Sequence, residues 1–229
     1  MLQIKNLSIS ADGIEQVVGA SLTIADNETQ ALIGPKFSGK SCLAYAIIGH
    51  PALEITQGSI SFNKKKINNV STEIRAKSGI YLCRQHAPNI DNINQLELIQ
   101  RCAKLRNDTR SSTDIEKAYL EISNQLLARK LYDEEFLRLD LLLISILKPS
   151  LIILDEIDHF VFKKDIKVLA EFIKEYTEGS SKLVITNNEE FLTAFDITTV
   201  SVMANGEIQR TGSLQSFEGI FNNVDTQLP

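Results

Sequence analysis

One eight-residue segment constrains the fold of this chain more than any other feature. Residues 34–41 read Gly-Pro-Lys-Phe-Ser-Gly-Lys-Ser and match in full the pattern G-x-x-x-x-G-K-[ST] of a phosphate-binding loop. An apolar run at 30–33 precedes this phosphate loop, and a helical pattern at 41–49 follows it. A loop between a strand and a helix N-terminus surrounds phosphates with backbone N–H groups. A chance match would have to reproduce this context too, so we expect a nucleotide phosphate site here.

The phosphate loop supplies candidate ligands for ATP and its metal. The Lys40 ammonium is expected to reach the β- and γ-phosphates, and the Ser41 hydroxyl to bind Mg²⁺. Phe37 is unusually bulky for a residue beside the nucleotide path. Cys42 lies near a helix N-terminus, where a thiol can become reactive, but the favoured interpretation is a small, inert filler of space. The candidate ATP-binding residues are Gly34, Pro35, Lys36, Phe37, Ser38, Gly39, Lys40, Ser41 and Cys42.

An acidic pair at the end of an apolar run completes the predicted site. Residues 151–154 are Leu-Ile-Ile-Leu and lead directly into Asp155 and Glu156. A buried strand that ends this way places Asp155 beside the phosphate loop, where its carboxylate can hold Mg²⁺ through water. Glu156 is then the candidate catalytic residue that orients or deprotonates the attacking water. Such an ending is common by itself, but together with the phosphate loop it predicts a site for ATP and Mg²⁺.

The alternation of short apolar runs and helical patterns predicts an α/β fold. Buried strands that alternate with helices after residue 30 indicate a mostly parallel sheet covered on both faces. The early strands predict a small antiparallel layer, and the helical stretch from 93 to 130 predicts an inserted helical subdomain. Asn205-Gly206 predicts a hairpin turn. The predicted strands are 2–4, 7–9, 16–24, 30–33, 58–62, 79–83, 150–155, 182–186, 200–203 and 207–210, with a solvated turn at 64–66, and the predicted helices are 41–49, 93–106, 114–130, 136–147 and 166–177.

A segment after the phosphate loop resembles a sequence that is typical of one family of ATPases. Residues 49–58 read Gly-His-Pro-Ala-Leu-Glu-Ile-Thr-Gln-Gly, which resembles the G-H-P-x-Y-E-V-T-x-G run of SufC, the ABC-type ATPase of SUF iron–sulfur cluster assembly. The resemblance extends to about residue 213. It implies a P-loop NTPase fold of the ABC-ATPase type as a single domain over 1–229, with a shortened helical subdomain at about 88–138. It also implies that Gln85 is the Q-loop glutamine, which senses Mg²⁺, contributes to catalysis and couples to partner subunits.

The segment that caps ATP in this family is altered here. An ABC domain hydrolyses ATP in a dimer, in which an LSGGE segment of one copy caps the γ-phosphate bound by the other. The matching residues 131–135 are Leu-Tyr-Asp-Glu-Glu. Tyr132 replaces the serine, and Asp133 and Glu134 replace glycines that allow close backbone approach. Each carboxylate would repel a polyphosphate by about 1 to 4 kcal/mol per close pair, so we expect the capping function to be lost.

Two further family motifs also differ. Residues 159–162 read His-Phe-Val-Phe in place of the D-loop, and Asn187 stands in place of the switch histidine. An asparagine can hydrogen-bond a phosphate but cannot carry a positive charge. His159 lies in a different loop from the switch position, and we interpret it as a surface histidine rather than a substitute.

These changes leave two hypotheses: a working or residual ATPase, and a pseudo-ATPase that binds Mg-ATP but hydrolyses little by itself. A homodimer would contain two phosphate loops and no segment to cap them, whereas a heterodimer with an ordinary ABC subunit would contain one complete site. The resemblance therefore implies SUF-type scaffold proteins, or another ABC subunit, as partners. The alternative function is the ATP-binding subunit of an ABC membrane transporter, which does not account for residues 49–58.

Composition argues against several other classes. The net charge of −5 is opposite to the basic excess of a nucleic-acid-binding domain. Cys42, Cys83 and Cys102 have no C-x-x-C spacing, so neither a zinc site nor a disulfide framework is predicted. The apolar runs fall short of the ~20 residues that span a bilayer, and no signal peptide is recognisable. We expect a cytoplasmic protein that meets a membrane only through a partner.

Overall fold

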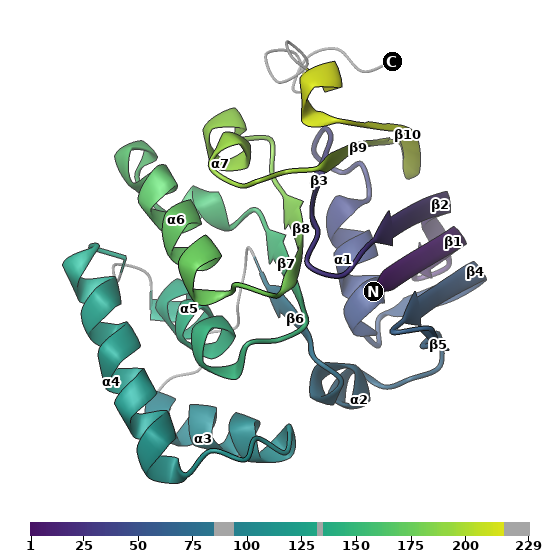
Figure 1. Ribbon diagram of the computed structural model, residues 1–229. Coiled ribbons are helices and arrows are strands. Elements are labelled where there is room, and N and C mark those ends of the chain that lie inside the picture. The colour runs from purple at the N-terminus through teal and green to yellow at the C-terminus, as the bar shows by residue number, and fades with distance from the viewer. Residues whose placement is uncertain (85–93, 132–134, 218–229) are drawn as a thin grey trace.

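The chain forms two β-sheets with helices on both sides of the larger one (Figure 1). The computed structural model describes residues 1–84, 94–131 and 135–217. The six-stranded core sheet has the order β10-β9-β3-β8-β7-β6, and the four-stranded sheet has the order β2-β1-β4-β5. The core strands are β3 (Thr29–Ile33), β6 (Ile80–Cys83), β7 (Leu151–Asp155), β8 (Ser181–Ile185), β9 (Thr199–Ala204) and β10 (Glu207–Gly212), and the others are β1 (Leu2–Ala11), β2 (Ile14–Ile24), β4 (Leu53–Phe62) and β5 (Lys65–Lys66).

The core sheet is parallel except at one edge. Its five strands β9, β3, β8, β7 and β6 pair in parallel, and β10 pairs antiparallel to β9. Every residue of β7 is buried, and successive side chains point to opposite faces. Ile152 and Leu154 therefore join the apolar cluster on one face, while Leu151 and Ile153 join the cluster on the other. This two-sided burial explains why the strand is an unbroken apolar run in the sequence.

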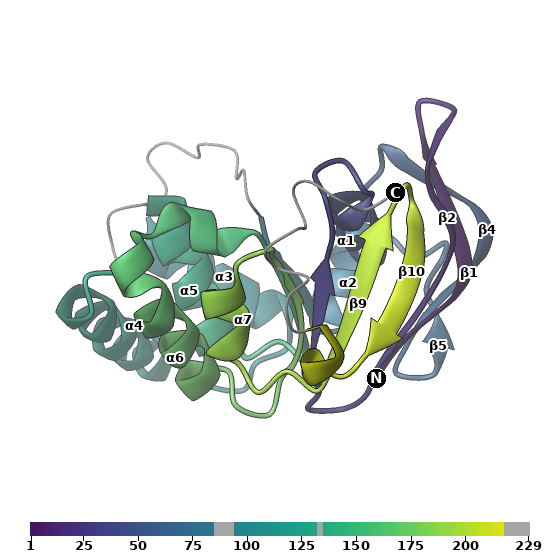
Figure 2. The ribbon, with the colours of Figure 1, turned by 90° about the horizontal axis from the view of Figure 1, so that it is seen from above.

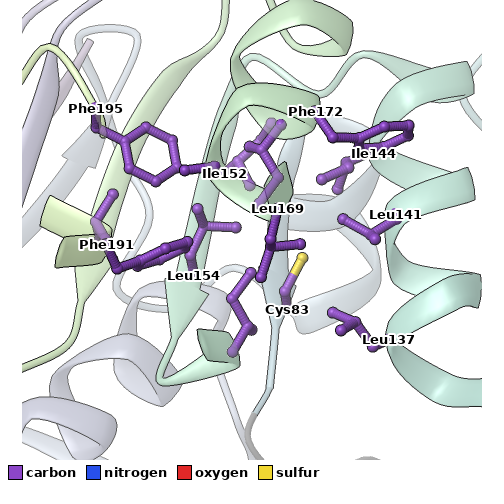
Figure 3. Packing of buried hydrophobic residues seen from close by; sticks show 14 of the residues in the cluster. Cys83, Leu137, Leu141, Ile144, Ile152, Leu154, Leu169, Phe172, Phe191 and Phe195 are labelled. Atoms are coloured by element: carbon purple, nitrogen blue, oxygen red, sulfur yellow. The ribbon is translucent and has the colours of Figure 1, made fainter. Parts of the chain in front are cut away.

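One face of the core sheet packs against helices. Figure 3 shows Ile152 and Leu154 facing side chains from α5 (Glu135–Leu147), α6 (Ile166–Tyr176) and α7 (Glu189–Thr193). The labelled helical side chains of this cluster are Leu137, Leu141, Ile144, Leu169, Phe172, Phe191 and Phe195, with Phe195 just beyond the end of α7.

The other face covers α1 (Lys40–Ile48), which lies between the two sheets (Figure 2). Side chains of α1 share one apolar cluster with residues of β1 and β7. Because α1 is covered from both sides, its apolar residues are spread around the helix and not confined to one stripe. The helix that follows the phosphate loop is thus held from two directions.

The helices α3 (Gln95–Leu105) and α4 (Ser112–Ala128) lie at the far end from the antiparallel sheet, with α5 between them and the core (Figures 1 and 2). Ser111 begins α4 with a capping box, in which its hydroxyl accepts from the Asp114 N–H and the Asp114 side chain accepts from the Ser111 N–H. The predicted α/β fold, with a mostly parallel sheet, an antiparallel layer and inserted helices, is therefore confirmed. The exact limits 88–138 remain a prediction, because 88–93 and 132–134 lie outside the described residues.

Several element boundaries differ from the sequence prediction. The expected strands 2–4 and 7–9 are one strand, β1, which continues through register shifts against both neighbours. β4 begins at Leu53 instead of residue 58, because Gly58 sits within it at a register shift rather than at its start. A Cβ at Gly58 would meet the Asn6 carbonyl oxygen at 2.2 Å, so a side chain is excluded there. The predicted solvated turn at 64–66 instead includes β5, whose two lysines are exposed.

Two short helices were not predicted. They are α2 (Thr72–Lys77) and α7, and both are too short to show a helical apolar period. Each begins at a polar cap: the Ser71 hydroxyl accepts from the Ile74 N–H, and the Asn188 side chain accepts from the Phe191 N–H. Within the described ranges, no helix is both long and apolar enough to cross a membrane.

A part-buried carboxyl group on α5 makes the stability of this fold depend on pH. The Tyr81 hydroxyl donates to Asp140 Oδ1 at 2.6 Å, and burial raises the pKa of Asp140 to about 6 despite this hydrogen bond. The folded state then binds more protons than the unfolded state between the unfolded pKa of about 4 and the folded pKa of about 6. The free energy of unfolding should fall as pH rises through this window, by up to about 3 kcal/mol at 1.36 kcal/mol per pKa unit.

Urea denaturation at pH 4.5 and pH 7 tests this expectation when the wild type is compared with Asp140→Asn. The variant should lose less stability over this interval, since its amide does not titrate. Equal losses in the two proteins would show that Asp140 is not responsible for the pH dependence.

Candidate functional site

The phosphate loop connects β3 to α1 and contains two glycines that the backbone requires. Gly34 has φ 152° and Gly39 has φ 101°, both in the region that favours glycine. A Cβ at Gly34 would lie 2.0 Å from the Met203 carbonyl oxygen, and one at Gly39 would lie 2.8 Å from the Gln16 carbonyl oxygen. The glycines of the sequence motif thus let the loop pass close to β9 and β2.

The hairpin of β9 and β10 supports the phosphate loop from one side. Asn205 and Gly206 have positive φ values of 51° and 81°, as the predicted turn requires. The Gly206 N–H donates to the Ser38 carbonyl oxygen at 3.0 Å, and the Gly206 carbonyl accepts from the Val18 N–H at 2.8 Å. A turn more than 160 residues further along the chain therefore fixes the position of the loop.

Lys40 points back into the phosphate loop. Its side chain is 4% exposed, and its Nζ donates to the carbonyl oxygens of Gly34 and Pro35, each at 2.8 Å. The same Nζ lies 4.0 Å from Glu156 Oε1. The ammonium is therefore held at the centre of the loop, where a nucleotide phosphate can share it.

Ser41 and Asp155, which the sequence predicts to bind the metal, lie in contact with each other. The Ser41 hydroxyl donates to Asp155 Oδ1 at 3.3 Å, although 114 residues separate the two in sequence. Burial raises the pKa of Asp155 to about 6, with a further increase from Glu156, while the hydrogen bond from Ser41 opposes the shift. A hydroxyl and a carboxylate are oxygen ligands of the kind that Mg²⁺ prefers. A bound divalent cation would favour the ionised carboxylate, so this donor set fits the metal.

Glu156 lies at the end of β7 in a left-handed conformation, with φ 52°. Its side chain is 15% exposed and lies close to Lys40 on one side and His159 on the other. His159 Nδ1 is 3.7 Å from Glu156 Oε2, and the imidazole is 54% exposed. His159 is exposed, as predicted from the sequence, but its proximity to the candidate catalytic carboxylate was not predicted.

Asn187 follows β8 and contacts the first residue of the phosphate loop. Its Oδ1 accepts from the Gly34 N–H at 3.1 Å, and its Nδ2 donates to the Gly34 carbonyl at 2.9 Å. The sequence makes this side chain a candidate for a phosphate contact. The contact with backbone was not expected, because β8 is placed beside β3 only by the strand order of the sheet.

A cavity of about 440 Å³ opens beside these groups. Phe37 is fully exposed at its rim, with φ 63°, a conformation that is unfavourable for a bulky residue. Burial and the nearby Asp155 carboxylate raise the pKa of the Cys42 thiol, which contradicts a reactive thiolate and agrees with the inert interpretation. The cavity is lined by Gln16, Lys36, Phe37, Ser38, Gly39, Lys40, Ser41, Cys42 and Glu156, of which Gln16 was not predicted.

The structure thus brings together the phosphate loop, Asp155 and Glu156, as predicted. Gln85, the predicted Q-loop residue, lies outside the described residues, as do Tyr132, Asp133 and Glu134 of the altered capping segment.

The chain matches the family model described as ABC transporter over residues 17–158, more than half of its length. The probable ATP-dependent transporter ycf16 of Cyanophora paradoxa is 28% identical over 231 residues, covering 94% of this chain and 89% of that protein. The probable ATP-dependent transporter slr0075 of Synechocystis sp. is 30% identical over 230 residues, covering 93% of this chain and 89% of that protein.

Solved structures share the fold. The ATP-binding cassette MJ0796, in a dimeric post-hydrolysis state with ADP and Pi, aligns with a TM-score of 0.76 at 20% identity, covering 93% of this chain and 99% of that one. A bacterial Atm1-family ABC exporter with ATP bound aligns with a TM-score of 0.75 at 18% identity. This alignment covers 97% of the present chain but 41% of the exporter, so the chain corresponds to one part of that protein.

Proposed function

The chain belongs to the ABC transporter family as an ATP-binding ABC ATPase subunit, and from that premise we propose that it is a SufC-like subunit that binds Mg-ATP and hydrolyses it slowly on its own. The observation that carries the proposal is the arrangement of Lys40, Ser41 and Glu156 around one cavity, with Asp155 hydrogen-bonded to Ser41. These groups supply a phosphate-binding ammonium, two metal-binding oxygens and a carboxylate for the attacking water.

Slow hydrolysis follows from the residues that should complete the site. The capping segment carries Tyr132, Asp133 and Glu134 where the family has a serine and two glycines. Asn187 is neutral and its amide is engaged with Gly34, so it supplies no positive charge to a terminal phosphate. Removal of one transition-state stabiliser commonly lowers a rate by about 10² to 10³. We therefore expect nucleotide binding without comparable turnover.

An ordinary ABC subunit would supply what this chain lacks. In a heterodimer the phosphate loop of this chain would face an intact capping segment of the partner, giving one complete site. The segment at 49–58 supports a SUF-type partner. The names of the relatives, which describe ATP-dependent transporters, favour the alternative that the chain serves a membrane transporter.

Binding and turnover measured on the same preparation test this proposal. The purified chain should bind Mg-ATP in calorimetric titration but release phosphate at a rate barely above that of Lys40→Ala. Robust turnover by the isolated wild type that disappears in Lys40→Ala would overturn the proposed slow hydrolysis. Affinity purification from cells then separates the two partner classes, because recovery of SUF scaffold proteins supports the proposal and recovery of a permease supports the transporter alternative.

A further inference from the structure

The side-chain amide of Asn187 makes two hydrogen bonds to the backbone of one residue, Gly34. Gly34 donates its N–H to Asn187 Oδ1 at 3.1 Å and accepts from Asn187 Nδ2 at 2.9 Å. The two residues are 153 positions apart in sequence, so this contact joins the end of β8 to the start of the phosphate loop. A paired amide contact of this kind fixes the orientation of the Gly34 peptide groups as well as their position.

Gly34 also lies against Lys40 of α1 and Met203 of β9. Its carbonyl oxygen accepts from Lys40 Nζ at 2.8 Å, the same oxygen that accepts from Asn187. A Cβ at Gly34 would lie 2.0 Å from the Met203 carbonyl oxygen, so β9 leaves no space for a side chain there. Asn187 therefore orients the carbonyl that in turn positions the lysine of the phosphate loop.

We propose that Asn187 is a positioning residue that holds the entrance of the phosphate loop through the Gly34 backbone. The proposal rests on nucleotide binding at this loop and deepens the proposed function by assigning the role of this residue. A group that pre-organises the loop affects any nucleotide that the loop binds, whether it has two phosphates or three. A group that contacts the terminal phosphate would instead affect the triphosphate alone.

The chemistry of the side chain fits this role. An asparagine offers an acceptor and a donor side by side, which matches the N–H and C=O of one residue. Its amide does not titrate, so the contact persists across the pH range in which a histidine would change charge. An aspartate at this position would accept from the Gly34 N–H but could not donate to the carbonyl.

Binding of Mg-ADP and of a non-hydrolysable Mg-ATP analogue to Asn187→Ala provides the test. Because two hydrogen bonds to the loop are lost, both dissociation constants should rise by about tenfold. The ratio of the two constants should stay at its wild-type value. Asn187→Asp should weaken both nucleotides at least as much, since one hydrogen bond is lost and a carboxylate is placed against the Gly34 carbonyl.

The neighbouring Asn188→Ala is the matched control. It removes the same kind of side chain, whose Oδ1 caps α7 by accepting from the Phe191 N–H at 3.2 Å. Its nucleotide affinities should equal those of the wild type even though α7 loses a cap. Hydrogen exchange supplies a readout that needs no nucleotide: the Gly34 N–H should be protected in the nucleotide-free wild type and lose protection in Asn187→Ala.

Each outcome has a distinct meaning. Weakening of the triphosphate analogue alone would overturn the inference in favour of a terminal-phosphate contact, and unchanged affinities or an unprotected wild-type Gly34 N–H would also overturn it. A wild type that binds neither nucleotide would overturn the proposed function, and the inference with it.

Discussion

Replacement of Arg75 with methionine should lower the free energy of unfolding by about 3 to 5 kcal/mol. The Arg75 side chain is 2% exposed, and burial lowers its pKa. Its guanidinium donates to four backbone carbonyls, those of Ala46, Ile47, Asn68 and Val70, at 2.7 to 3.0 Å. Methionine fills the space of the stem but donates nothing, so these carbonyls lose the guanidinium donor, and Ala46 keeps the Gly49 N–H. Each unsatisfied buried acceptor costs about 1 to 3 kcal/mol.

The effect should be structural, because Arg75 supports the C-terminus of the helix that carries Lys40. The carbonyls of Ala46 and Ile47 belong to the last turn of α1, where few backbone donors remain, although Ala46 also accepts from the Gly49 N–H at 3.1 Å. Gly49 follows directly in a left-handed conformation, and a Cβ there would meet Arg75 Nε at 2.8 Å. The arginine thus joins α2 to the end of α1.

Equilibrium urea denaturation checks this prediction, with Arg101→Met as the matched control. Arg101 is 74% exposed and pairs with Glu97 one helical turn away, an interaction that contributes about 0.5 kcal/mol or less. A loss in Arg75→Met no larger than that in Arg101→Met would show that the four buried hydrogen bonds do not stabilise the fold.

Replacement of Lys40 with methionine should weaken the binding of Mg-ADP and Mg-ATP by about 100-fold or more. The Lys40 ammonium is fixed inside the loop by the Gly34 and Pro35 carbonyls and is ready to contact phosphate oxygens. A hydrogen bond to a charged group contributes about 1.5 to 3 kcal/mol. Loss of two such contacts amounts to about 3 kcal/mol, which corresponds to about two orders of magnitude in affinity.

Isothermal titration of each nucleotide into folded protein measures this effect. Lys163→Met removes an exposed ammonium in the segment after β7 and should leave both affinities within a factor of two. A wild-type affinity in Lys40→Met would mean that the nucleotide does not bind at this loop.

Local patterns were sufficient to predict most of the core. The apolar runs of β3, β7 and β8 predict strands that are buried on both faces. The glycines of the phosphate loop predict its backbone conformation. The sequence predicted β4 incompletely and missed α2, because a register shift at Gly58 and a six-residue helix leave no clear period. Arg75 gave no signal either, since a charged residue on a short helix is ordinarily exposed.

The residues of the candidate site also fall into two groups: those that the sequence predicts and those that only the structure reveals. The sequence by itself determined the phosphate loop and the positions of Asp155, the expected metal ligand at the end of β7, and the adjacent Glu156, because each lies within a segment whose pattern implies its local structure. Only the tertiary structure decided that Asn187 binds Gly34 and that Arg75 holds the end of α1. These contacts depend on β8 lying beside β3 and on α2 packing against α1, and such spatial neighbours leave no periodic signal in the sequence.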